Sequence, residues 1–214
     1  LNEGHITTTG EQSYNGAVTL GADSTLNAGA GNVTFTSTVD GAYALTVNST
    51  GTTAFNHAVG GAAPLTSLTT NVGGLVLVNT ATVHTTGEQT FNDMVTLQQS
   101  ATLTGSRVNF NAAVMSAGDL NVVGDATLNG NTVTTTGAQS YSGAVTLQKD
   151  ALLDAGASNV TFSGPVDTAN GISAKSLTVN TSGTTTFGGA VGATHALSSL
   201  TTDANTGGSV VLNG

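Results

Sequence analysis

The stretch Thr-Thr-Gly-Glu-Gln-Ser-Tyr-Asn-Gly-Ala-Val-Thr-Leu, residues 8–20, decides the fold of this chain because it occurs three times. It returns as Thr-Thr-Gly-Glu-Gln-Thr-Phe-Asn-Asp-Met-Val-Thr-Leu at 85–97 and as Thr-Thr-Gly-Ala-Gln-Ser-Tyr-Ser-Gly-Ala-Val-Thr-Leu at 135–147. Around the first and third copies, residues 6–35 align without gaps to residues 133–162, and 21 of the 30 positions are identical. The sequence therefore predicts a repeat protein, with blocks at about 6–82, 83–132 and 133–214.

A shorter unit, an aromatic residue followed four places later by valine, recurs along the whole chain. Neighbouring units often stand about 20 residues apart, which is a typical length for one turn of a solenoid. The unit is read at Tyr14/Val18, Phe35/Val39, Phe55/Val59, Phe91/Val95, Phe110/Val114, Tyr141/Val145, Phe162/Val166 and Phe187/Val191.

Local hydrophobicity alternates with a period of two residues, as in Leu45-Thr-Val47 and Val160-Thr-Phe162. This alternation indicates short, half-buried strands, and Thr and Val suit a pleated surface. Gly, Asn, Asp and Ser interrupt the pattern every few residues, which predicts turns. No stretch has a helical period with caps, so we expect no helix of substance.

Together these patterns predict one all-β domain over 1–214: a right-handed, single-stranded parallel β-helix of roughly ten coils, each about 20 residues long. We expect the inward side chains to stack like on like, with aromatics near one corner, valines on one wall and leucines on another. A β-sandwich also has short strands and frequent turns, but it gives no reason for the recurring aromatic-to-valine spacing.

The composition excludes several classes of function. Only 7% of the residues are charged, the net charge is −9 and the sequence pI is about 4.3. With Arg107, Lys149 and Lys175 as its only basic residues, the chain has no basic patch for nucleic acid or an anionic membrane. It has no cysteine and no apolar stretch long enough to span a bilayer. We interpret the scattered acids as serving solubility.

Three stretches of the sequence carry a family resemblance: the third copy of the long motif, Asn159-Val-Thr-Phe162, and Thr184-Thr-Thr-Phe-Gly-Gly-Ala-Val191. They resemble the β-strand repeats of large bacterial exoproteins, namely filamentous-haemagglutinin-like adhesins and autotransporter passengers. The resemblance covers nearly the whole chain, Ile6 to Asn213. It implies a right-handed β-helix, export across the outer membrane, and a role as an extended stalk, adhesin or matrix fibre at the cell surface. It carries over no functional residue.

Candidate catalytic and metal-binding residues are few. The closest acid pairs are Asp150/Asp154 and Asp119/Asp125, although stacking could also align Asp23 and Asp150 with other acids. The histidines His5, His57, His84 and His195 lack the spacing of a metal site. Repeated calcium-loop signatures are absent, which leaves at most a single Ca²⁺ at a turn. We therefore predict no enzyme activity, no catalytic or metal-binding residues and no cofactor.

Threonine triplets are the one feature of the surface that suggests a binding face. Thr7-Thr8-Thr9, Thr134-Thr135-Thr136 and Thr184-Thr185-Thr186 could align on a flat wall, an arrangement that resembles β-solenoid ice-binding proteins. The simpler interpretation is that threonine has a high strand propensity and tolerates exposure.

The function expected from the sequence is a non-enzymatic structural rod of a secreted or surface-attached bacterial adhesin or extracellular fibre. Its ends carry no capping helix, so we expect either flanking coils of a longer chain or end-to-end stacking with copies of itself. The alternative is a β-helix that binds or cleaves carbohydrate, with host or matrix glycans as partners and aromatics and acids in an outer groove. An ice-binding solenoid is the third hypothesis.

Overall fold

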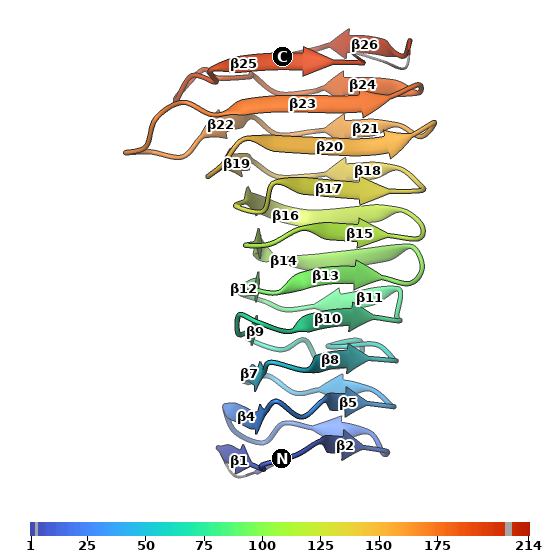
Figure 1. Cartoon of the computed structure of the whole chain (residues 1–214), viewed down its shortest axis with the longest axis vertical. Helices are drawn as coiled ribbons and strands as arrows, with labels where there is room; N and C mark the ends of the chain where they lie inside the picture. Colours follow the sequence, from blue (N-terminus) through green and yellow to red (C-terminus); the bar gives the residue numbers. More distant parts are fainter. Residues whose placement is uncertain (3, 204–206) are drawn as a thin grey trace.

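The computed structural model of the chain, which describes residues 1–2, 4–203 and 207–214, is a β-solenoid of about 10 turns with about 21 residues per turn (Figure 1). All paired strands are parallel, and the described residues contain no helix. With strands about 4.8 Å apart, the rod is on the order of 50 Å long. This confirms the predicted solenoid and its coil length.

Each coil contributes to three walls, which we number in the order in which the chain visits them. Wall 2 is the ten-stranded sheet that faces the viewer in Figure 1. Its strands are β2 (Gln12–Tyr14), β5 (Val33–Phe35), β8 (Thr52–Phe55), β10 (Leu75–Val78), β13 (Met94–Leu97), β15 (Val114–Ser116), β17 (Thr132–Thr135), β20 (Ala151–Gly156), β23 (Ser176–Thr181) and β25 (Ser199–Thr202).

Walls 1 and 3 are joined by two long strands, β14 (Ala101–Phe110) and β16 (Leu120–Leu128), which begin on wall 3 and end on wall 1. Gly124 lies at the bend of β16 with a φ of +116°, and a Cβ there would come within 1.9 Å of the Gly105 carbonyl oxygen. This corner therefore requires glycine. The other strands of wall 1 are β1 (His5–Thr7), β4 (Ser24–Gly29), β7 (Ala44–Ser49), β9 (Ser67–Thr70), β12 (Glu88–Phe91), β19 (Val145–Leu147) and β22 (Val166–Thr168); those of wall 3 are β3 (Val18–Thr19), β6 (Val39–Asp40), β11 (Thr82–His84), β18 (Gln139–Tyr141), β21 (Val160–Phe162), β24 (Thr184–Phe187) and β26 (Ser209–Leu212).

The core is a column of apolar side chains that the three walls enclose. In β7 the residues alternate between half-buried and buried, and the same alternation recurs in most strands. Leu45 and Val47 are fully buried, while the intervening Thr46 faces outward. The predicted period-two alternation is confirmed, because every second side chain of a strand points to the same face.

The aromatic rings do not share one corner, so that part of the predicted core is wrong. They form three separate stacks with ring centroids 5.0–6.0 Å apart: Tyr14–Phe35–Phe55 on wall 2, Phe91–Phe110 on wall 1 and Tyr141–Phe162–Phe187 on wall 3. Phe91 follows Phe55 by 36 residues, and Tyr141 follows Phe110 by 31. Neither interval is a whole number of turns, so the motif moves to another wall at each break.

Spacing alone does not identify a core aromatic. Tyr43 also precedes a valine, Val47, by four residues, yet it lies in a corner before β7 and is 39% exposed. By contrast, Phe35, Phe55 and Phe162 are fully buried. An aromatic residue enters the core only where it falls on an inward strand position.

Candidate functional surfaces

The long motif forms a corner module that occurs once on each wall. Its first threonine donates a hydroxyl hydrogen bond to the glycine carbonyl oxygen two residues later, at 2.6 Å for Thr8, 2.8 Å for Thr85 and 2.5 Å for Thr135. The following strands are β2 on wall 2, β12 on wall 1 and β18 on wall 3. One local sequence therefore builds the same turn in three orientations about the rod axis.

The glutamine of this module joins successive coils from inside the rod. Gln139 is buried, and its Nε2 donates to the carbonyl oxygen of Val133 at 3.2 Å and to that of Asp154, on the next coil, at 2.9 Å. Gln12 and Gln89 donate to the carbonyl oxygens at the corresponding positions. The glutamine side chain is therefore a buried connector between coils.

The second copy of the module lacks one hydrogen bond. The Tyr14 hydroxyl donates to Gln12 Oε1 at 2.9 Å, and that of Tyr141 donates to Gln139 Oε1 at 3.1 Å. The second copy has Phe91 in this place, and Gln89 Oε1 is buried without a hydrogen-bond partner. A buried acceptor left without a donor costs stability.

Replacing Phe91 with tyrosine is therefore expected to stabilise the fold. The new hydroxyl would reach Gln89 Oε1 as it does in the other two copies, and we expect a gain of about 1 kcal/mol in the free energy of unfolding. Urea unfolding of Phe91→Tyr checks the gain, and Tyr141→Phe, which creates the same vacancy in the third copy, should lose a similar amount. A destabilised Phe91→Tyr would show that wall 1 cannot accommodate the hydroxyl.

The same module predicts sensitivity to alkali. Burial raises the pKa of the Tyr141 hydroxyl above its usual value, and it also raises the pKa of Tyr14. The stability that the neutral hydroxyl contributes is therefore complete below pH ~10, where tyrosine in the unfolded chain titrates, and is lost as the pH rises toward the folded-state pKa. Tyr141 alone contributes a slope of up to about 1.4 kcal/mol per pH unit above pH 10. Urea unfolding midpoints measured between pH 8 and 11.5 check this loss of stability. The fall of the midpoint with pH should be shallower in Tyr141→Phe.

The acids connect neighbouring coils, which is a larger role than the solubility we expected of them. The Oδ1 of Asp119 accepts the Ala138 N–H at 2.8 Å, and that of Asp150 accepts the Ser176 N–H at 2.8 Å. The hydrogen bonds to Ser176 lower the pKa of Asp150, whereas burial raises that of Asp93. The same kind of bond to a backbone N–H of a neighbouring coil is made by Asp23, Asp40, Asp93, Asp125 and Asp167.

The acid pairs that the sequence singled out do not form a common site. Asp119 precedes the wall 3 part of β16, whereas Asp125 lies in its wall 1 part. Asp23 and Asp150 precede strands on different walls, β4 and β20. Asp125 instead pairs with Arg107: its Oδ2 is 3.4 Å from Arg107 Nη2. Arg107 Nη1 also lies 3.9 Å from Glu88 Oε1. Within residues 1–2, 4–203 and 207–214 no three His, Cys, Asp or Glu side chains are grouped as a metal site would require.

The histidines are also scattered. His5 lies in β1 on wall 1 and His84 lies in β11 on wall 3. His57 lies in the connection after β8, and the His195 Nε2 is 3.2 Å from Asn170 Oδ1 in a corner where two connections meet. The structure therefore brings no two of these side chains into one site.

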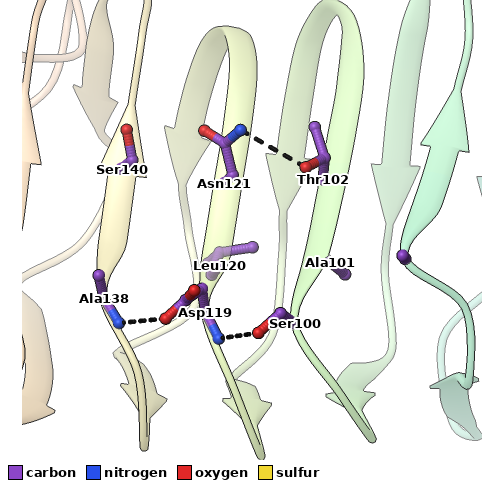
Figure 2. Close-up of a pocket in the computed structure, with 9 residues that line it drawn as sticks. Ser100, Ala101, Thr102, Asp119, Leu120, Asn121, Ala138 and Ser140 are labelled. Atoms are coloured by element: carbon purple, nitrogen blue, oxygen red, sulfur yellow. Dashed lines mark hydrogen bonds between the residues drawn. The ribbon is translucent and has the colours of Figure 1, made fainter.

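A groove of about 490 Å³ crosses the coils at the start of wall 3 (Figure 2). It exists because small residues occupy successive coils at one corner, among them Ala81, Ser100 and Ala138. Beside them runs an outward row formed by Thr102, Asn121 and Ser140. Figure 2 shows that many of its polar groups already bond to one another: the Asp119 N–H donates to Ser100 Oγ at 2.9 Å, and Asn121 Nδ2 donates to Thr102 Oγ1 at 3.5 Å.

The groove contains no aromatic side chain. Seven of the eight motif aromatics are buried, and the eighth, Tyr14, is partly buried against the core. The outer platform of aromatics that a carbohydrate-binding β-helix was expected to show is therefore absent at these positions. Sequence reasoning gave no signal for the groove, because its lining residues come together only through stacking.

The threonine triplets do not align, which corrects the expected threonine face. Thr7 lies in β1 on wall 1, Thr134 in β17 on wall 2, and Thr184–Thr186 in β24 on wall 3. A different file of outward residues runs along seven successive coils of wall 1, between His5 and Asp167, and the register of paired strands connects them. Its members are Thr25, Thr46, Thr69, Thr90, Asn109, Thr127 and Thr146.

Comparisons with known proteins place the chain in no family. No family model, no curated protein and no solved structure matches it. Among the residues that the structure describes, no helix is long and apolar enough to cross a membrane.

Proposed function

We propose that this chain is a non-enzymatic structural rod of a secreted or surface-attached bacterial protein, an adhesin stalk or an extracellular fibre. The observation that carries the proposal is the continuity of the ladder, because wall 2 alone pairs ten strands in parallel from β2 to β25. Buried glutamines and aspartates at the surface join the coils at the corners. Seven aspartates are thus already occupied in holding coil to coil.

The last coil supports end-to-end growth of this rod. Leu200, Val210, Val211 and Leu212 are 40–69% exposed there, and Leu212 continues the stack that runs through Phe162 and Phe187. An exposed strand edge with apolar side chains favours pairing with a further strand. One more coil, from the same chain or from a second copy, would cover these residues.

Electron microscopy and small-angle scattering of the purified chain test both the structural rod and its end-to-end growth. We expect rods on the order of 50 Å long, from ten strand spacings, or filaments of that unit, and no release of sugar from a panel of polysaccharides. Leu212→Asp should remove the filaments while leaving the circular dichroism spectrum unchanged. A compact particle would contradict the structural function. So would cleavage of a polysaccharide, provided that a second folded preparation of the chain shows the same cleavage.

One observation favours ice binding as a second candidate, namely the file of six threonines and one asparagine on wall 1. Its outward hydroxyl and methyl groups repeat about every 4.8 Å along a rigid sheet. Thermal hysteresis measured with the wild-type chain and with Thr69→Lys tests this candidate. Freezing-point behaviour identical to that of an inert protein would dismiss it.

A further inference from the structure

The outer face of wall 2 carries an apolar patch, formed by Leu75 and Leu77 of β10, Met94 of β13 and Met115 of β15. These are the outward positions of adjacent strands, which alternate with the buried Val76, Val95 and Val114. Met94 is 39% exposed and Met115 is 51% exposed, and they are the only methionines of the chain. The patch is therefore separate from the core and is not needed to fill it.

Wall 2 differs from its neighbour in charge as well as in hydrophobicity. Its ten strands contain a single charged residue, Asp154. Wall 1, by comparison, places Glu88, Arg107 and Asp125 on adjacent strands. The corresponding outward positions of wall 1 hold the polar file of threonines described above. A flat, almost uncharged sheet face with large exposed apolar side chains is typical of a surface that packs against another protein.

We infer that wall 2 is the interface through which two copies of this chain pair side by side, with the apolar patch at its centre. Each copy has a net charge of −9, so two copies repel over most of their surface and approach best where charges are absent. The patch lies on the fourth to sixth of the ten strands of wall 2, near the middle of the rod. A two-fold axis through it lets two rods overlap along most of their length.

The dimensions of the wall suit such a pair. Ten strands about 4.8 Å apart, each about four residues long, give a face on the order of 600 Å² per copy before side-chain relief is counted. Stable interfaces bury about 800 Å² of accessible surface per partner. A hollow of about 270 Å³ beside Met115, lined also by Thr96, Leu97 and Ala117, offers room for an apolar side chain of the second copy.

Sedimentation equilibrium of the full chain, with single substitutions on two walls, tests this pairing. We expect the wild-type chain to form a dimer at micromolar concentration, and Met115→Asp and Leu77→Asp each to weaken the dimer at least tenfold. Thr127→Asp, at an outward position of wall 1, is the matched control and should leave the dimer unchanged. Circular dichroism verifies that all variants fold, since these side chains point away from the core.

Three results would overturn the inference. The wild-type chain stays monomeric at high micromolar concentration, which leaves the patch to another kind of partner; the dimer is unaffected by both wall 2 variants; or Thr127→Asp weakens the dimer as much as they do. The lateral pair is separable from end-to-end stacking. Leu212→Asp should remove filaments and retain the dimer, whereas Met115→Asp should retain filaments of single width, so either mode can fail without the other.

Discussion

Replacing Phe162 with alanine is expected to lower the free energy of unfolding by about 3–5 kcal/mol, the range for deleting a buried aromatic ring. Phe162 is fully buried on β21 and lies between two rings, at 5.4 Å from Tyr141 and 5.1 Å from Phe187. The deletion removes both ring contacts, and the neighbouring coils cannot collapse into the gap because the strand ladder fixes their spacing. Urea unfolding followed by circular dichroism measures the loss.

Tyr43→Ala is the matched control, because Tyr43 has the same spacing to a valine but is 39% exposed. We expect it to change stability by less than about 0.5 kcal/mol. A small loss in Phe162→Ala, similar to that of the control, would contradict the assignment of the aromatic stacks to the core.

The second large effect concerns the connector between coils. Gln139→Leu is expected to cost about 3 kcal/mol, because the carbonyl oxygens of Val133 and Asp154 both lose a buried donor. The hydroxyl of Tyr141 loses its acceptor as well. Leucine is close to glutamine in size, so the loss reports hydrogen bonding and only secondarily packing.

Gln148→Leu serves as the control, since Gln148 follows the same motif but is exposed. A double-mutant cycle of Gln139→Leu with Tyr141→Phe should give a coupling energy of about 1 kcal/mol, because both changes remove the same hydroxyl-to-amide bond. Strict additivity, or a cost below about 1 kcal/mol for Gln139→Leu, would refute the connector role.

The corner modules show where local sequence was sufficient. The Thr-Thr-Gly-x-Gln turn has the same threonine-to-glycine hydrogen bond in all three copies, whichever wall follows it. Gln139 nevertheless donates one of its hydrogen bonds to the carbonyl oxygen of Asp154, 15 residues later, and this partner is identifiable only after the coils have stacked. The candidate surfaces likewise become identifiable only after the coils have stacked. The groove of wall 3, the polar file of wall 1 and the apolar patch of wall 2 each collect residues from several successive coils.

The sequence by itself determined the class of fold, the absence of helix among the described residues, the coil length and the inward face of each strand. These follow from interactions within a few residues, because alternation and turn chemistry set the direction of each side chain locally. Only the tertiary structure decided which wall each motif occupies, and hence that the aromatics form three stacks and the threonine triplets diverge. The physical reason is cumulative register: corners of unequal length add up along the chain, so 36 residues from Phe55 to Phe91 move the motif from wall 2 to wall 1.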